Sequence, residues 1–496
     1  MSSEQPLQTA ETNASWADLF SNGNALRTLT LVGGVALYAI NMYIVTTILP
    51  NIVNDIGGLE FFSWNTTLFI VTSIIGSTMT NKLVINLGPK FAYLLALLLF
   101  AVGSIGCAIA FNMPFLLLGR AFQGLGGGIM FALGYTLIRI VFEQHLWTRA
   151  TALVSAMWGL STLFGPTIGG FFAQGGHWRW AFWSLLPFII VLAIIVNSQI
   201  TQKITEQDNE QPKIPFYSLV LLILSVIFIS LSSLKEEIIW TTMCLILGLM
   251  TLVWMIKVDK NSSNKLLPTG AYSLNTTLCR TYLVMILLMI AMTTEIFVPY
   301  FLQIIHGMKP LSAGYMTAIM AAGWTISALP SAAKLGKTRR TLMMIGPFIV
   351  TCSLIALAFT MSNNVYTEIL LFIIYGFALF GIGFGIGLIW PHLLNLVFVS
   401  APKGEETLTS ASITTVQLYA TALAAAFAGL VANQAGLVRI GGVIGAQVAS
   451  NWLFALFSIA PVLAIFLVIK ILKSADVSGY PLNSQQQKSL CFRKGF

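Results

Sequence analysis

Residues 114–138 read PFLLLGRAFQGLGGGIMFALGYTLI, an apolar run of 25 residues that contains a single charge, Arg120. A helix of about 20 apolar residues is long enough to cross the hydrocarbon core of a bilayer. Small residues at four-residue spacing let neighbouring helices approach closely. No strand precedes the glycines, which argues against a nucleotide-binding loop. The stretch therefore predicts a tightly packed membrane helix.

The rest of the chain repeats this apolar pattern. Its 496 residues are 57% hydrophobic and only 9% charged, and so few charges cannot cover a soluble surface. This composition also argues against disorder and against a β-barrel. We therefore expect an all-α polytopic membrane protein. Fourteen apolar runs are long enough to be transmembrane helices: 29–50, 64–86, 91–111, 114–138, 149–173, 178–199, 216–234, 238–257, 281–303, 311–333, 341–361, 366–390, 408–432 and 448–472.

The basic residues predict the orientation of these runs. With both termini in the cytoplasm, 21 of the 26 Lys and Arg residues fall in cytoplasmic segments. Loops rich in Lys and Arg favour the cytoplasmic side of a membrane, where they also contact anionic lipid. The loops on the other side hold four: Arg179, Lys235, Lys309 and Arg439.

Two polar stretches, 200–215 and 258–280, bracket the seventh and eighth runs. They divide the chain into six, two and six runs, a plan that predicts two similar bundles joined by an inserted pair of helices. Paired bundles with a site between them are a common transporter plan. The expected domains are a cytoplasmic tail (1–28), a six-helix bundle (29–200), a linker with two extra helices (201–280), a second six-helix bundle (281–472) and a cytoplasmic tail (473–496).

Only two charged residues fall deep within a predicted span, Glu295 and Arg120. A charge at this depth costs about 2.5–3.5 kcal/mol on insertion scales, so it usually faces a cavity or a partner. At 1.5 Å per residue, both lie about 9–12 Å from the outer membrane edge, and Asn41 lies about 14 Å from it. The three polar groups therefore share one layer. Each charge could instead satisfy a partner in its own surroundings.

Three further stretches accompany the span-four run. They are GLSTLFGPTIGG at 159–170, WRWAFW at 178–183 and VPYFLQIIHGMKPLSAG at 298–314. Taken with the span-four run, they resemble motifs of the major facilitator superfamily, and within it those of the fourteen-span drug:proton antiporter family. The resemblance covers about residues 29–472.

This resemblance implies export of small molecules by alternating access, driven by inward proton flow across a cytoplasmic (inner) membrane. In such families the span-four arginine, here Arg120, is associated with proton coupling. The span-five motif is associated with the hinge and seal of antiporters. Its residues here are Gly165, Pro166, Gly169 and Gly170.

Two departures from the family pattern affect the expected mechanism. Asn41 occupies the position of an acidic residue in span one, and an amide cannot release a proton. The loop NKLVINLGPK at 81–90 resembles G-x-L-x-D-R-x-G-R-K, but Ile85 replaces the aspartate and Asn86 replaces the arginine. Leu83, Gly88 and Lys90 of the pattern are kept, but the two replacements argue against the charge-based latch between the bundles that the family pattern implies.

We therefore hypothesise that Glu295 is the principal proton-binding carboxylate and that Arg120 takes part in the coupling. Substrate and proton would compete for Glu295, which favours a cationic substrate. Aromatic faces bind flat or cationic organic molecules at about 0.5–2 kcal/mol each. The polar and aromatic candidates for the substrate cavity, any one of which could instead be a packing residue, are Tyr38, Asn41, Asn65, Trp158, Gln303, Trp324, Trp390, Gln417 and Tyr419.

The expected function is thus proton-coupled efflux of amphiphilic, preferentially cationic, compounds by a monomer. Its expected partners are the substrate, protons and membrane lipid, with no nucleic acid, no metal and no cofactor beyond the proton gradient. Alternatives of the same fold are a dedicated exporter of one metabolite or siderophore, and an uncoupled facilitator. An enzyme would show paired deep catalytic groups and a sensor would show a soluble domain, so neither is expected.

Overall fold

The computed structural model describes residues 16–21, 24–143, 146–200, 214–363 and 368–473. Within these ranges the secondary structure consists of sixteen α-helices and short 3₁₀ turns. Most of the two predicted tails, at 1–15 and 474–496, lies outside the described residues.

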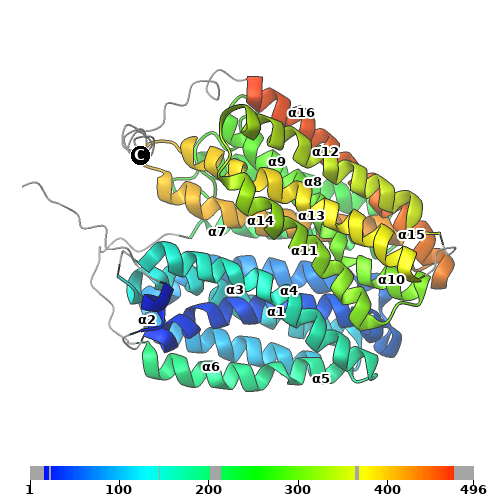
Figure 1. Cartoon of the computed structure of the whole chain (residues 1–496), viewed down its shortest axis with the longest axis horizontal. Helices are drawn as coiled ribbons and strands as arrows, with labels where there is room; N and C mark the ends of the chain where they lie inside the picture. The colour runs from blue at the N-terminus through cyan, green and yellow to red at the C-terminus, as the bar shows by residue number, and fades with distance from the viewer. Residues whose placement is uncertain (1–15, 22–23, 144–145, 201–213, 364–367, 474–496) are drawn as a thin grey trace, which may run out of the picture.

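The N-terminal half forms one bundle, drawn in blue to green in Figure 1. Its second helix, α2, is interrupted at Gly88, whose φ of 81° and ψ of 157° are not helical. Pro89 follows directly and lacks the N–H that would continue the helix. The elements of this half are η1 Trp16–Leu19, α1 Asn24–Ile56, η2 Leu59–Phe61, α2 Trp64–Ala108, α3 Met113–Val141, α4 Trp147–Gln174, α5 Trp178–Trp183 and α6 Leu185–Gln199.

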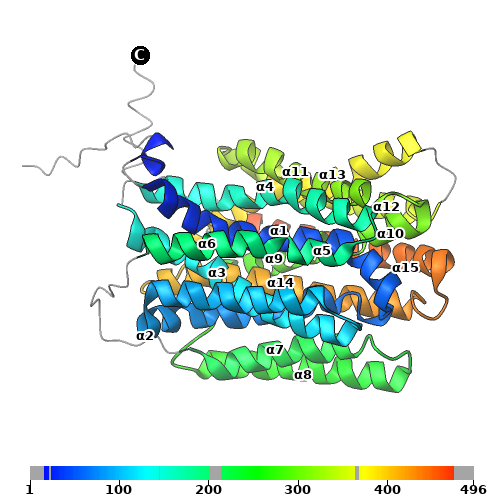
Figure 2. The ribbon, with the colours of Figure 1, turned by 90° about the horizontal axis from the view of Figure 1, so that it is seen from below.

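The C-terminal half forms a second bundle, which lies alongside the first (Figure 1). Its elements are α9 Thr277–Thr293, η4 Thr294–Ile296, α10 Val298–His306, α11 Pro310–Ala332, α12 Gly336–Thr360, α13 Glu368–Val399, α14 Glu406–Gln434, α15 Gly442–Phe457 and α16 Ile459–Lys473. Between the two halves of the sequence, α7 (Phe216–Leu231) and α8 (Ile238–Asn261) form a hairpin. This hairpin lies outside the bundles, where α7 packs against both α2 and α14 (Figure 2).

Eleven helical segments in the described part of the chain are long and apolar enough to cross a membrane. One of them, 59–108, contains two predicted runs and the break at Gly88. Every predicted run falls on a helix. The count of fourteen crossings, however, needs this segment to cross twice, and it also needs α7 and α11, which are outside the set of eleven.

The molecule has two distinct ends. We call the end where α1 begins at Asn24 and α16 finishes at Lys473 the basic end, because the predicted cytoplasmic loops gather there; it is on the left in Figure 1. The opposite end carries the junctions from α1 to α2 and from α14 to α15. Most helices run the full distance between these ends.

Glycines set the closest helix crossings in both bundles. In α3, a Cβ added at Gly124 or Gly128 would collide with the backbone of α2. In α13, a Cβ at Gly383 or Gly387 would collide in the same way with the backbone of α11. Such close approach is typical of small residues in membrane helices. The contact between α3 and α2 in the first bundle and the contact between α13 and α11 in the second therefore use glycines in the same way.

Candidate functional site

Arg120 lies inside the N-terminal bundle with 2% of its surface exposed. Its Nη1 donates to Oε1 of Gln123 at 2.7 Å, and its Nε donates to the backbone oxygen of Asn65 at 3.3 Å. The guanidinium also sits 4.1 Å from the ring centre of Phe69, a cation–π contact. Among the described residues no carboxylate pairs with Arg120. Amide and backbone oxygens and one aromatic face therefore replace the water that this cation lost on burial.

Gln123 connects Arg120 to Asn41. Its Nε2 donates to Oδ1 of Asn41 at 3.4 Å and to Oγ of Ser104 at 2.9 Å. Sequence reasoning quoted Gln123 as part of the motif but gave it no role. The spacing could have predicted its contact with Arg120, because a residue three positions later lies on the same face of a helix. Two members of the predicted polar layer, Arg120 and Asn41, are thus joined through one amide.

Glu295 occupies a separate position in the C-terminal bundle. It lies in η4, the short 3₁₀ turn that interrupts the helical path between α9 and α10. Its Oε2 is buried and has no hydrogen-bond partner. The side chain of Tyr43 on α1 lies near this carboxyl group, without a hydrogen bond between them. No hydrogen bond or ion pair of the described residues joins Glu295 to Arg120 or Asn41. A half-buried carboxylate whose buried oxygen has no donor suits a group that takes up a proton or meets a cation.

A cavity of about 830 Å³ opens between the two bundles towards the basic end. It is lined by parts of α2, α3 and α4 on one side and of α13 and α14 on the other, and none of its lining residues is charged. Of the predicted substrate residues, Trp390 and Gln417 line it. Sequence reasoning missed the aromatic residues Phe131, Tyr135, Trp147 and Phe398, which also line it.

Several other candidates lie beside this cavity. Trp324 packs against Trp390 with ring centres 5.0 Å apart. Tyr38 packs against Phe131 at 5.4 Å and against Trp158 at 6.0 Å. Because Phe131 and Trp390 line the cavity, these three candidates form a second layer behind its wall.

Two candidates make contacts elsewhere. The hydroxyl of Tyr419 lies 3.2 Å from Oγ of Ser225 on α7, so this tyrosine faces the inserted hairpin. Nε2 of Gln303 on α10 donates to the backbone oxygen of Thr47 on α1 at 3.4 Å. Gln303 therefore connects the two bundles rather than lining the cavity described above.

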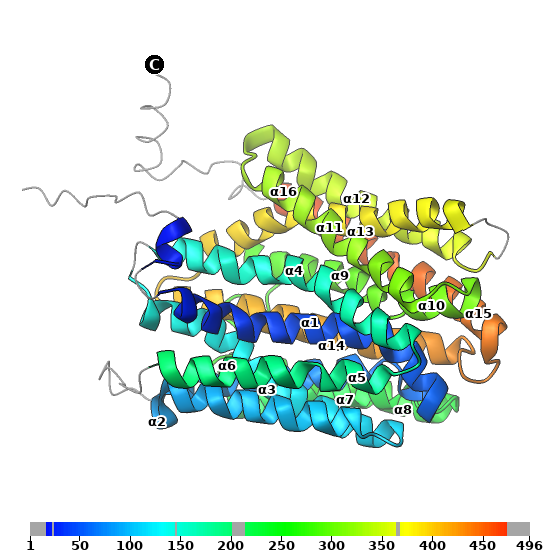
Figure 3. The same cartoon turned by 60° about the horizontal axis from the view of Figure 1, so that its bottom comes forward.

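The span-five motif lies where α4 meets α11 towards the opposite end (Figure 3). A Cβ added at Gly170 would come within 2.5 Å of the Cα of Leu311, and one at Gly314 would come within 2.9 Å of Cβ of Pro166. The hydroxyls of Thr167 and Tyr315 form a hydrogen bond across the same seam. These contacts leave no space for larger residues between the two helices.

The other two motif glycines pack against α1. Gly165 faces the backbone and Cβ of Tyr43, and Gly169 faces the backbone of Ile44. The α4 motif therefore lies between α1 of its own bundle and α11 of the other bundle. A change in the angle between the bundles must therefore change the contact between α4 and α11.

Aromatic rings also join the bundles at the opposite end. Phe62, in the turn between η2 and α2, stacks on Phe297 with ring centres 4.8 Å apart. It also meets Tyr300 edge to face at 5.1 Å. Closure at this end and a cavity at the other correspond to a conformation that faces the basic end.

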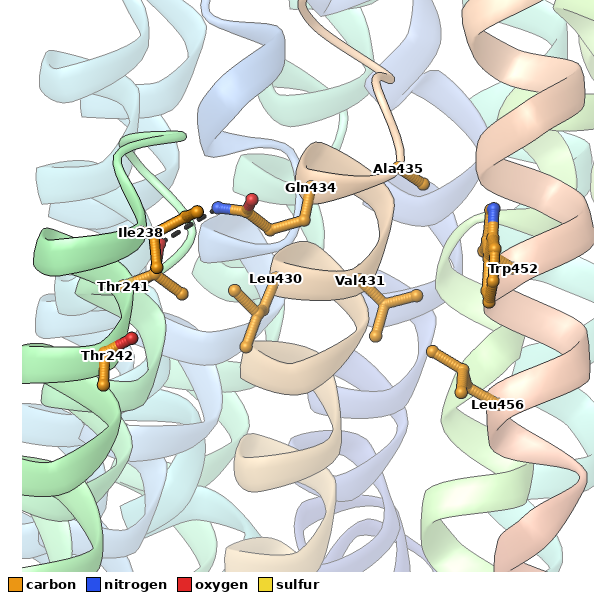
Figure 4. A pocket seen from close by; sticks show the side chains of 9 residues that line it. All are labelled: Ile238, Thr241, Thr242, Leu430, Val431, Gln434, Ala435, Trp452 and Leu456. Atoms are coloured by element: carbon orange, nitrogen blue, oxygen red, sulfur yellow. Dashed lines mark hydrogen bonds between the residues drawn. The ribbon is translucent and has the colours of Figure 1, made fainter.

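A second hollow lies on the outside of the C-terminal bundle. It is a groove of about 510 Å³ between α8, α14 and α15 near the opposite end (Figure 4). Thr241, Thr242 and Gln434 give it a polar wall, and Leu430 and Leu456 give it an apolar one. It belongs to the junction of the inserted hairpin with the C-terminal bundle, and the bundle interface does not contribute to it.

Comparison with known proteins agrees with this architecture. A probable multidrug-efflux transporter of Mycobacterium tuberculosis is 33% identical over 464 residues, which cover 92% of this chain and 97% of that protein. The multidrug transporter protein MdtP of Bacillus subtilis is 27% identical over 395 residues, covering 78% of this chain and 72% of the relative. Both relatives are thus similar along most of their length.

Solved structures share the fold at low sequence identity. A POT family transporter in complex with a thioalcohol-conjugated peptide matches with a TM-score of 0.65 and 14% identity, over 90% of this chain and 97% of that one. A D-xylose-proton symporter matches with a TM-score of 0.62 and 13% identity, with the same coverage. The family model of the Major Facilitator Superfamily matches residues 31–425. The chain is a multi-pass membrane transporter rather than an enzyme, and it belongs to the Major Facilitator Superfamily.

Proposed function

We propose that the chain is a proton-coupled multidrug efflux transporter that exports amphiphilic, preferentially cationic, small molecules by alternating access. The names of the relatives support the multidrug part of this proposal. The cavity at the basic end supports the loading step, because its aromatic and hydroxyl lining suits flat amphiphiles. Rocking of the bundles then separates α4 from α11 and opens the opposite end for release.

The observation that carries the coupling is the unpartnered Oε2 of Glu295. In its ionised form Glu295 attracts a cation, and in its neutral form it does not. Entry of a proton from the opposite end therefore favours release of the substrate, and loss of that proton at the basic end resets the site. Arg120 supplies a fixed positive charge, which Gln123 and Asn65 hold in place.

The proposal includes fourteen crossings by a monomer in the cytoplasmic membrane, with both termini inside. The break at Gly88 supports two crossings by α2, since a non-helical glycine followed by proline lets the chain reverse. The excess of Lys and Arg in loops at the basic end supports the orientation. The same proposed helix count and the motifs support membership of the 14-span drug:proton antiporter subfamily.

Proton movement in inverted membrane vesicles tests the coupling. A pH-sensitive dye reports an imposed gradient while a panel of organic cations is added to wild type, Glu295→Gln and Glu237→Gln. Glu237 is an exposed loop residue at the start of α8 and provides the matched control. We expect wild type and Glu237→Gln to dissipate the gradient with some cations, and Glu295→Gln to dissipate it with none. Full proton exchange by Glu295→Gln would refute this role.

An uncoupled facilitator is the second candidate, and Asn41 is the observation that favours it. The amide of Asn41 bonds to Gln123 at the position where an acid would titrate. A facilitator equilibrates radiolabelled substrate in these vesicles but never concentrates it and moves no protons. Extending the panel to metabolites and siderophores identifies a dedicated exporter, because that protein responds to one such compound only.

A further inference from the structure

The inserted hairpin of α7 and α8 is hydrogen-bonded to the C-terminal bundle at three places along its length: near its middle and at each end. Midway along α7, Oγ of Ser225 lies 3.2 Å from the hydroxyl of Tyr419 on α14. Both residues are buried, so water does not compete for this contact. The other two attachments lie at the two ends of the hairpin and have different chemistry.

At the basic end, the segment 262–276 after α8 folds into a compact loop. Asp259 at the end of α8 is fully buried and accepts hydrogen bonds from the N–H of Leu266 at 2.7 Å and from the hydroxyl of Tyr272 at 2.7 Å. The same loop reaches α14, since Thr269 donates its N–H and its hydroxyl to Glu405 at 2.6 Å each. The end of α8, the loop 262–276 and the start of α14 are thereby connected by hydrogen bonds.

At the opposite end, two amides of α14 hold the turn between α7 and α8. Nδ2 of Asn433 donates to the backbone oxygen of Ser233 at 3.0 Å. Nε2 of Gln434 donates to the backbone oxygen of Lys235 at 3.0 Å and to Oγ1 of Thr241 at 3.1 Å. Figure 4 shows the bond from Gln434 to Thr241, which crosses the groove between α14 and α8.

The hairpin's own residues have no comparable attachment to the N-terminal bundle. Nδ2 of Asn433 on α14 also donates to the backbone oxygen of Glu60 in η2 at 3.1 Å, a bond between the bundles at the closed end that has to break when that end opens. α7 packs against α2, but no hydrogen bond or ion pair in the described ranges joins residues 214–276 to residues 24–200. Side-chain packing between two apolar helices contains no directional bond, and small sliding of packed helices is a known mode of conformational change. Hydrogen bonds to fixed backbone oxygens cannot slide without breaking.

We propose that α7, α8 and the loop 262–276 form one rigid body with the C-terminal bundle, and that α7 slides along α2 when the bundles rock. This inference rests on the proposed alternating-access function. The hairpin then keeps the seam between α2 and α14 covered on its outer side throughout the cycle (Figure 2). In the part of the chain that the structure describes, neither α7 nor α8 packs closely against α4 or α11.

Cross-linking separates the two kinds of contact. In a background without the five native cysteines, a short bifunctional thiol reagent joins Gln434→Cys to Thr241→Cys in one variant. In a second variant it joins Thr167→Cys to Tyr315→Cys across the bundles. We expect export to survive the first cross-link with less than a twofold loss and to stop with the second. Loss of export on cross-linking the first pair would overturn the proposal.

Distances between spin labels give a readout that does not require transport. Labels at the exposed positions Met250 on α8, Phe466 on α16 and Ile190 on α6 report the hairpin and the two bundles. One condition should favour the state open at the basic end, and the other should favour the state open at the opposite end. Between these conditions the 250–466 distance should stay constant and the 250–190 distance should change. If instead the 250–466 distance changes and the 250–190 distance stays constant, the hairpin moves with the N-terminal bundle and the proposal is wrong. If the 190–466 distance never changes and wild type does not export, the proposed function itself fails.

Discussion

Replacing Gly170 with alanine should open the opposite end of the transporter. The new Cβ would lie 2.5 Å from the Cα of Leu311, and ordinary contact begins at 3.4 Å. α4 and α11 must therefore separate by about 0.9 Å, and overpacking of this kind costs about 1–3 kcal/mol. The strain exists only while the two helices touch. It thus shifts the balance towards the state open at the opposite end by roughly 5- to 150-fold.

Gly159→Ala is the matched control in the same helix. A Cβ at Gly159 meets nothing within 4 Å, so the two variants share the gain in helix propensity, about 0.5–1 kcal/mol, but not the collision. The reporter is Thr47→Cys, a position that is 1% exposed and lies behind the seam. An impermeant thiol reagent should label it faster in Gly170→Ala and at the wild-type rate in Gly159→Ala. Equal rates in both variants would refute this account of the seam.

Three further predictions concern other parts of the molecule. Asn41→Asp places an acid against Gln123, so the pH profile of export should shift; an unchanged profile would exclude position 41 from the coupling layer. Trp390→Ala removes one aromatic wall worth about 0.5–2 kcal/mol, so a cavity substrate should bind roughly two- to thirtyfold more weakly, as equilibrium binding would measure. The hydroxyl and the N–H of Thr269 hold the pKa of Glu405 below its ordinary 4.5, so their stabilisation is complete above pH 4.5 and is lost as pH falls through the lowered pKa. Glu405→Gln should therefore lower the free energy of unfolding at neutral pH by about 0.5–1.5 kcal/mol. Thermal unfolding should show a lower melting temperature than wild type at neutral pH, and the difference should disappear in acid. A gap that persists in acid would contradict this assignment.

The sequence predicted the helices well because apolar length is a strong signal in a membrane protein. All fourteen runs fall on helices, and the break between the second and third runs falls at Gly88. The interruption at η4 was not predicted. A 3₁₀ turn inside an apolar run leaves the hydropathy unchanged, so no periodic signal marks it.

The arrangement of the site was harder to predict. Gln417 and Tyr419 were both expected to line the cavity, yet Gln417 lines it while Tyr419 contacts Ser225. Residues two apart on a helix point in nearly opposite directions, so one sequence rule could have separated them. The link from Asn41 to Arg120 depends instead on how α1 and α3 pack, which sequence spacing within one helix cannot show.

The two buried charges lie in different halves of the molecule, and only one of them exchanges protons in the proposed cycle. Arg120 is permanently charged, so in this proposed cycle Glu295 would carry one proton inward for each monovalent cation that leaves. Such an exchange transfers no net charge. Export of a monovalent cation is then driven by the pH difference alone, and collapsing the membrane voltage leaves it unaffected. A divalent cation, by contrast, has to move outward against the voltage, which makes the number of charges on a substrate a direct limit on how far it can be concentrated.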